Sequence, residues 1–180
     1  MALTDDQRGI VRGGAIALVV TLVFGIPAYL WLPPAWLGAE ALATVADRFA
    51  FAIRWDIPIL IWLAACVRVV SRGRFKSAAD IGGSAFSKPS PMIAVKRAVL
   101  QNSLEQTVLA AGAHLALAVT LRGRELVLIP ILVLLYLAGR VWFAAGYAAG
   151  APGRAPGMVL TAGPTFAALM LAGALALLGR

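Results

Sequence analysis

The chain has 180 residues, of which 61% are hydrophobic and 13% are charged, and its mean hydropathy is +0.87. Soluble domains are about half apolar and about a quarter charged, so this composition excludes an ordinary soluble domain and indicates an integral membrane protein. The net charge of +8 does not indicate a nucleic-acid partner, because the basic residues lie mostly between apolar runs, as the positive-inside rule places them. The single cysteine, Cys66, excludes a disulfide framework.

Five apolar runs are close to the roughly 20 residues that a helix needs to cross a bilayer. They cover residues 13–32, 50–71, 98–120, 126–148 and 156–179. The first ends at Pro33 and Pro34, which cannot continue a helix. The sequence therefore predicts an all-α integral membrane protein built as a bundle of spanning helices, with no separate soluble domain.

The first run could instead belong to a cleaved signal peptide, with the small residues Ala41-Leu42-Ala43 near the cleavage point. We expect a retained helix, because the apolar stretch is longer than the usual core of a signal peptide. Asp5 and Asp6 also precede the first arginine, which is not typical of a signal peptide.

Charged residues interrupt three of the runs, and the fourth run contains Arg140. The second run contains Arg54, Asp56 and Arg68, and the third contains Glu105 and His114. Arg54 and Asp56 lie close to the outer end of the second run, so we expect their side chains to reach the membrane interface. We interpret His114 as a helix-packing residue, because no second histidine or carboxylate in the pattern supports a metal site.

Positive charge concentrates between the second and third runs. That segment carries Arg72, Arg74, Lys76, Lys88, Lys96 and Arg97 against the single acid Asp80. The positive-inside rule places it in the cytoplasm, and alternation then puts the N-terminus and the segment around Arg154 on the same side. The high content of Ala, Gly and Arg is compatible with a bacterial source. We therefore expect a multi-pass protein of the bacterial cytoplasmic (inner) membrane with its N-terminus inside.

Several polar residues fall in the cytoplasmic half of the predicted spans. A charge in the bilayer costs roughly 3 kcal/mol on insertion scales, so such residues usually face the bundle interior and have partners. Asn102 and Glu105 are three residues apart and share a helical face, as do Arg140 and Tyr147, which are seven apart. Arg154 follows in the next loop, and we expect these side chains to meet.

This combination favours an anionic, peptide-like ligand. Guanidinium groups bind carboxylates bidentately, and the carboxylate of Glu105 could pair with a ligand ammonium group. Arg72, at the cytoplasmic end of the second run, can reach the same half of the membrane. The apolar surroundings suit a lipophilic second substrate that arrives from the bilayer.

Two stretches of this region resemble the MAPEG superfamily, the membrane-associated proteins in eicosanoid and glutathione metabolism. They are KRAVLQNSLE at 96–105 and RVWFAAGY at 140–147, the latter followed by Arg154. The resemblance covers about residues 57–178. It implies a four-helix membrane domain over residues 51–180, a homotrimer, and glutathione bound between protomers near the cytoplasmic side. Residues 1–50 would then form an extra N-terminal transmembrane helix and its outer loop.

The resemblance also implies roles for single residues. Those that would bind glutathione are Asn102, Glu105, Arg140, Tyr147, Arg97 and Arg72. Arg154 would be catalytic and would stabilise the thiolate that attacks an electrophile, since a nearby cation favours the ionised thiol. Glutathione would act as a co-substrate, a lipophilic small molecule would be the second substrate, and no metal is implied.

Three features depart from the family pattern. Ala98 stands where an arginine usually lies four residues before Asn102, and Arg97 lies about 100° further around the helix. Phe143 stands where an aromatic hydroxyl often lies four residues before Tyr147. The first span precedes the four spans of the family. These departures bear on the expected activity more than on the expected fold.

Structural interpretations of the same residues stay open. Asn102 and Glu105 could pair across helices as structural contacts, and Arg140 could form an ion pair with Glu105. Tyr147 could be an aromatic residue of the membrane interface. The arginines near the end of the second run, Arg68, Arg72 and Arg74, could simply set the topology.

Three functions remain for the chain as a whole. The first is a membrane-bound glutathione transferase or peroxidase that acts on lipophilic electrophiles. The second is a non-catalytic protein of the same fold whose polar cluster is structural. The third is a small transporter or channel subunit, which is disfavoured because the first and fifth spans carry no charge and no internal repeat is present.

Overall fold

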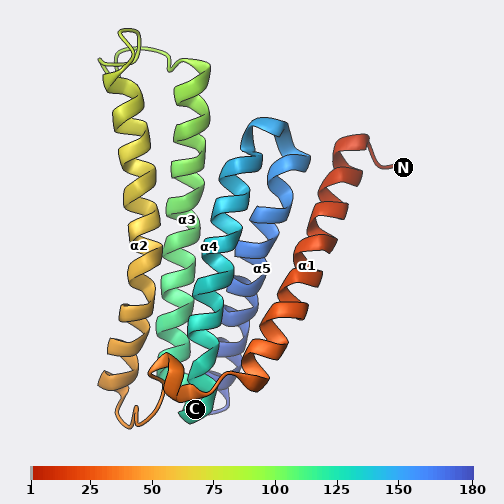
Figure 1. The fold of residues 1–180 in the computed structure, drawn as a ribbon, viewed down its shortest axis with the longest axis vertical. Coiled ribbons are helices and arrows are strands. Elements are labelled where there is room, and N and C mark those ends of the chain that lie inside the picture. Colours follow the sequence, from red (N-terminus) through yellow and green to blue (C-terminus); the bar gives the residue numbers. More distant parts are fainter. Residues whose placement is uncertain (1) are drawn as a thin grey trace.

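A computed structural model describes residues 2–180 as a bundle of five long helices that lie side by side (Figure 1). The long helices are α1 (Asp5–Trp31), α2 (Val45–Phe75), α3 (Pro91–Thr120), α4 (Leu128–Gly146) and α5 (Gly150–Leu177). Short 3₁₀ turns lie between them: η1 (Pro34–Leu37), η2 (Gly123–Val127) and η3 (Tyr147–Ala149). Each of the five predicted spans falls on one of the long helices, which confirms the all-α fold class.

The two ends of the bundle carry different connections (Figure 1). The N-terminus, the loop between α2 and α3, and the turn between α4 and α5 lie together at what we call the loop end. The C-terminus and the connections from α1 to α2 and from α3 to α4 lie at the opposite end. The helices α2 and α3 rise beyond the α4–α5 turn, because α2 has 31 residues whereas α4 has 19.

Four of the long helices begin several residues before the predicted runs, and polar caps start three of them, α1, α2 and α3, outside the apolar stretches. Thr4 accepts a hydrogen bond from the backbone N–H of Gln7 at 3.3 Å, and Thr44 accepts one from that of Asp47 at 3.1 Å. In both cases the third residue bonds back to the cap, which forms a capping box. Ser90 caps α3 with a proline directly behind it.

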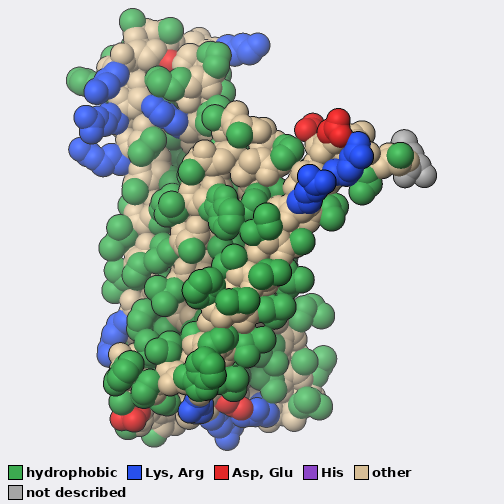
Figure 2. Space-filling view, turned by 45° about the vertical axis from the view of Figure 1, so that its right-hand side comes forward, with side chains coloured by type: hydrophobic (Ala, Val, Ile, Leu, Met, Phe, Trp, Pro, Cys, Tyr) green, Lys and Arg blue, Asp and Glu red, His purple; other side chains and the backbone are tan. Residues whose placement is uncertain are grey.

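The outer surface identifies the chain as an integral membrane protein. Figure 2 shows apolar side chains over the middle of the molecule, with lysines and arginines gathered near its two ends. Three segments are long and apolar enough to cross a membrane: α1, α2 and the stretch Gly123–Leu177 that holds α4 and α5. The helix α3 is not among them, because it carries much of the polar interior of the bundle, including buried Gln106, Thr107 and His114.

Glycines allow the two helices of the α4–α5 pair to approach closely. A Cβ on Gly157 would overlap the backbone nitrogen of Phe143, and a Cβ on Gly139 would overlap the Thr161 hydroxyl. Membrane helices associate through such small residues, since lipid offers no hydrophobic drive between them. This packing holds α4 and α5 in a fixed register and so fixes the residues that each helix presents at the loop end.

The N-terminal helix α1 lies along the outer side of α5 (Figure 1). A Cβ on Gly9 would lie 2.7 Å from Cβ of Pro152, and one on Gly13 would lie 2.9 Å from Cδ of Pro156. Only Gly13 and Ala17 of α1 are buried, so the helix meets its neighbour through small residues and turns its large apolar side chains outward.

Two buried side chains inside the bundle correct an expectation. Asp56 was expected at the membrane interface, but only 5% of it is exposed, and its Oδ1 lies 2.6 Å from Nδ1 of His114. This contact joins α2 to α3 and satisfies two ionisable groups that would be costly alone in the bilayer. His114 therefore packs between helices as predicted, but it does so with a carboxylate partner that the sequence pattern did not show.

Candidate functional site

A cavity of about 320 Å³ lies at the loop end, between α3 and the α4–α5 turn. Its polar lining residues are Asn102 from α3, Tyr147 from the turn, and Arg154 from the first turns of α5. The remaining lining is apolar and consists of Ile10, Phe143, Ala151, Ala155 and Met158. We call it the Arg154 cavity.

The turn between α4 and α5 brings Tyr147 and Arg154 together. Gly150 adopts a positive φ of 81°, a conformation that glycine takes without strain, and this lets the chain reverse directly after η3. The guanidinium carbon of Arg154 lies 4.7 Å from the centre of the Tyr147 ring, which also packs edge-on against Phe143 at 5.3 Å. The Arg154 side chain is thus held over an aromatic face at the cavity.

Arg140 lies directly behind the cavity and is fully buried, with 0% of its surface exposed. Its Nη1 donates to Oδ1 of Asn102 at 2.7 Å, and its Nε donates to Oγ1 of Thr161 at 3.0 Å. The guanidinium also lies 4.4 Å from the centre of the Phe143 ring. Since Arg140 engages the amide oxygen of Asn102, the amide N–H₂ of that side chain is left to donate toward the cavity.

The electrostatics of the Arg154 cavity favour an anion. Neither Arg140 nor Arg154 forms a salt bridge with any carboxylate of residues 2–180. The start of α5 adds few free donors, because the Gly150 N–H donates to the Tyr147 carbonyl and Pro152 has no N–H. The positive potential at this small, largely apolar space therefore comes from the two guanidinium groups.

The family model of the MAPEG family matches residues 55–174, which is two thirds of the chain. The chain belongs to the MAPEG family. No curated protein and no solved structure matches it. Membership links the protein to membrane-associated glutathione metabolism in general. The matched residues run from the middle of α2 nearly to the end of α5, so they contain every polar residue of the Arg154 cavity and leave α1 outside.

The structure of this MAPEG protein brings together four of the residues predicted from the sequence. Asn102, Tyr147 and Arg154 line one cavity, and Arg140 holds Asn102 from behind. The alternative ion pair between Arg140 and Glu105 is wrong, because the partners of Arg140 are Asn102 and Thr161.

Three other predicted residues lie elsewhere in this protomer. Glu105 is exposed and accepts a hydrogen bond from Nε2 of Gln101 at 3.0 Å. Arg97 lines a different cavity, between α2 and α3, and Arg72 is exposed and lines neither cavity. Their role toward glutathione stays a prediction, because the family resemblance implies a ligand between protomers.

The sequence reasoning missed several groups of the polar interior. Thr161 on α5 accepts from Arg140, and Tyr136 on α4 shares a 2.7 Å hydrogen bond with Thr107 of α3. Tyr136 lies four residues before Arg140, on the same helical face, so its spacing could have placed it in this cluster. Ile10 gave no signal, since it lies on a helix that no motif connects with the site.

Over residues 2–180, no group of three or more histidine, cysteine, aspartate or glutamate side chains is close enough to hold a metal ion. The polar groups that line the Arg154 cavity are a guanidinium, an amide and a phenol.

Proposed function

We propose that this protein is a membrane-bound transferase that joins the thiol of glutathione to lipophilic electrophiles at the Arg154 cavity. One observation carries the proposal: Asn102, Tyr147 and Arg154 come from separate parts of the family-matched segment and line the same cavity. Each provides a group that suits an anionic tripeptide, namely an amide donor, a phenol and a guanidinium.

Arg154 is the residue that we propose to activate the thiol. A free thiol has a pKa of about 8.5, and a nearby cation lowers it by favouring the thiolate. The guanidinium of Arg154, which lines the cavity, acts in this direction. The thiolate sulfur then forms a bond to the electrophilic carbon, while the leaving group departs with the bonding electron pair.

Arg140 acts in this proposal as a positioning residue. Its side chain is buried and holds the oxygen of Asn102, so it fixes the direction in which the Asn102 amide donates. The Arg140 charge also raises the electrostatic potential in the neighbouring cavity, which favours the carboxylates and the thiolate of glutathione.

The second substrate is expected to be apolar. Ile10, Phe143 and Met158 give the Arg154 cavity an apolar wall. The outer surface of the bundle is also apolar over its middle part, as expected of a surface in contact with lipid (Figure 2). A compound dissolved in the bilayer can thus approach the thiolate without crossing water.

The test is glutathione binding to the purified full-length protein, measured by calorimetry in detergent. Wild type is compared with Arg154→Gln and with Arg122→Gln, a matched loss of charge at an exposed position of the opposite end. We expect wild type and Arg122→Gln to bind alike and Arg154→Gln to bind more weakly, with a smaller thiolate absorbance in the ultraviolet. Folded wild-type protein that does not bind millimolar glutathione would overturn the proposal.

A second candidate is a non-catalytic MAPEG protein whose polar cluster only holds the helices together. Two observations favour it: Phe143 has no hydroxyl, and the hydrogen bonds of Arg140 go to side chains of the bundle itself. In that case Arg140→Gln would lower stability, whereas Arg154→Gln would change neither stability nor glutathione binding.

We also propose an orientation and an assembly. Most basic residues lie at the loop end, so the positive-inside rule places that end in the cytoplasm, and in a bacterium the membrane would be the inner one. The homotrimer implied by the family resemblance is part of the same proposal. Labelling of single cysteines introduced at Lys88 and Arg122 would test the orientation, and cross-linking in native membranes would test the trimer.

A further inference from the structure

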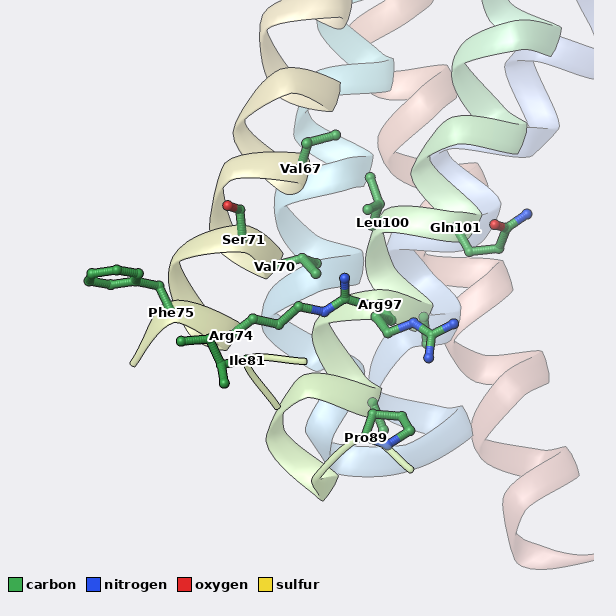
Figure 3. Close-up of a pocket in the computed structure, with 12 residues that line it drawn as sticks. Val67, Val70, Ser71, Arg74, Phe75, Ile81, Pro89, Arg97, Leu100 and Gln101 are labelled. Atoms are coloured by element: carbon green, nitrogen blue, oxygen red, sulfur yellow. The ribbon is translucent and has the colours of Figure 1, made fainter. Parts of the chain in front are cut away.

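A second cavity, of about 750 Å³, opens between α2 and α3 at the loop end (Figure 3). It shares no lining residue with the Arg154 cavity. Its lining is partly polar and partly apolar, and it includes Val67, Val70, Arg74, Arg97, Leu100 and Gln101. We call it the α2–α3 cavity.

The walls of the α2–α3 cavity are held at a fixed separation. A Cβ on Gly73 would lie 2.6 Å from Cδ1 of Ile93, so the two helices touch beside the cavity and only glycine fits there. Asp80 in the connecting loop accepts hydrogen bonds from the Ser90 backbone N–H and hydroxyl, each at 2.8 Å, and so ties the loop to the start of α3. The cavity is therefore a feature of the packed structure.

Two arginines line this cavity, one from each helix. Arg74 reaches from α2 across the opening toward α3, where Arg97 lies (Figure 3). Neither forms a salt bridge with any carboxylate of the described residues, and Arg74 bonds only to the neutral hydroxyl of Ser84. The nearby acid Asp80 is already engaged by Ser77 and Ser90. Asp80 offsets one of the two positive charges, so one excess positive charge remains at the cavity. That excess charge favours a bound anion, and the oxygens of a phosphate suit guanidinium groups.

Apolar side chains continue from the charged rim into the membrane. Val67 and Val70 on α2 and Leu100 on α3 line the deeper part of the cavity (Figure 3). From Arg74 to Val67 is two helical turns, or about 10 Å at 1.5 Å per residue. That distance carries a ligand from the headgroup region into the acyl region, so the lining matches a molecule with an anionic head and an apolar chain.

We propose that the α2–α3 cavity binds an anionic phospholipid, with its phosphate between Arg74 and Arg97 and an acyl chain along Val67, Val70 and Leu100. Basic pockets between membrane helices recognise anionic headgroups in this manner, through charge at the rim and lipid contact below it. The site is separate from the Arg154 cavity, so it does not depend on the function proposed there.

The experiment measures which lipids stay bound to the full-length protein. Wild type is placed in nanodiscs of phosphatidylcholine mixed with phosphatidylglycerol, released in mild detergent, and analysed by native mass spectrometry. The double variant Arg74→Gln/Arg97→Gln removes the proposed phosphate ligands. The double variant Lys76→Gln/Lys88→Gln removes the same charge at the same end, at residues that do not line the cavity.

We expect wild type and the lysine variant to retain phosphatidylglycerol over phosphatidylcholine, and the arginine variant to lose this preference by about tenfold. Circular dichroism checks that all three are folded. Equal retention by both double variants would overturn the proposal, because the preference would then come from general surface charge. Displacement of the lipid by millimolar inorganic phosphate would also overturn it, since the site would then bind the free ion.

Discussion

The two ends of the bundle use their arginines in opposite ways. At the opposite end, Arg48 donates to the carbonyl oxygen of Ala118 at 2.9 Å, Arg124 donates to that of Tyr29 at 3.0 Å, and Arg180 pairs with Glu125 at 2.9 Å. At the loop end, Arg74, Arg97 and Arg154 line cavities and form no salt bridge within residues 2–180.

The difference follows from what each end must satisfy. The helices α1 and α3 finish at the opposite end, and the last carbonyl groups of a helix have no partner within it. Arg48 and Arg124 donate hydrogen bonds to such carbonyl groups, so their guanidinium groups already have partners within the bundle. The helices α1, α3 and α5 begin at the loop end, whereas α2 and α4 finish there, so helix dipoles of both signs meet at that end. Arg8 is ion-paired with Asp5 at the same end. The partner therefore decides whether an arginine is structural: Arg74, Arg97 and Arg154 engage no carboxylate of residues 2–180 and are available to a ligand.

The largest effect is expected at Arg154. Replacement by Gln should lower the rate of glutathione conjugation by about 100-fold or more, because it removes charge stabilisation at the reacting sulfur. The melting temperature should stay within a degree or two of wild type, since the side chain forms no salt bridge in the described chain. Steady-state kinetics and thermal unfolding would be measured together, and Arg154→Lys should recover part of the rate. A large fall in the melting temperature of Arg154→Gln would contradict the prediction, because Arg154 would then be a structural residue like those at the opposite end.

The second effect is expected at Arg48 and should have the reverse profile. The Arg48→Gln change leaves the carbonyl groups of Ala118 and Ala43 without their donor, at a cost of about 1–3 kcal/mol in the free energy of unfolding. Glutathione binding per folded molecule should not change. Unfolding in mixed micelles would measure the cost, with exposed Arg54→Gln as the control. An Arg48 variant as stable as the control would show that these hydrogen bonds do not hold the end closed.

A smaller effect is expected for the ion pair between Arg180 and Glu125. About a third of each side chain is exposed, at 39% and 36%, so Glu125→Gln should cost less than about 1 kcal/mol and only at low salt. The glutamine retains an oxygen that can accept from the backbone N–H of Arg122. The variant therefore measures the loss of the charge without the loss of this capping hydrogen bond. Unfolding at two salt concentrations would measure this, and a cost that high salt leaves unchanged would contradict it.

The smallest effect is local and depends on pH. Hydrogen bonds from Ser77 and Ser90 hold the pKa of Asp80 below its ordinary value of 3.8. Because the folded-state pKa is the lower one, the loop gains this stabilisation fully above the ordinary value and loses it as the pH falls through the lowered pKa. Hydrogen exchange of residues 76–90 should therefore be slow at neutral pH and faster in strong acid. Asp80→Asn should exchange faster at neutral pH, and equal exchange would contradict the assignment.

The sequence predicted the residues of the candidate site better than it predicted the ends of the helices. The predicted topology brought Asn102, Arg140 and Tyr147 to the same half of the membrane, and the structure joins them at one site. Helical spacing also put Glu105 on the face of Asn102, but Glu105 is exposed and bonded to Gln101. The starts of α1, α2 and α3 lay outside the apolar runs, because hydrogen-bonding caps such as Thr4 and Ser90 set them and not hydropathy.

What the sequence could not show were contacts between distant segments. Asp56 and His114 are 58 residues apart, and only the packing of α2 on α3 makes them partners. Arg97 was predicted to bind glutathione, but the direction of its side chain toward the α2–α3 cavity depends on the loop that positions both helices. Ile10 reaches the Arg154 cavity because glycines of α1 fit against prolines of α5, which periodicity does not reveal.

The different lengths of the helices bear on how a lipophilic substrate would reach the proposed active site. The helix α2 is about 46 Å long at 1.5 Å per residue, whereas the bilayer core is about 30 Å thick. The α4–α5 turn that carries Tyr147 and Arg154 lies below the tips of α2 and α3 (Figure 1), and hence nearer to the lipid. A lipophilic substrate would reach the α4–α5 turn by lateral diffusion in the bilayer. The mole fraction of the substrate in the membrane would therefore set the rate of turnover. Adding inert lipid at constant substrate should therefore slow turnover as surface dilution, while dilution with buffer should not.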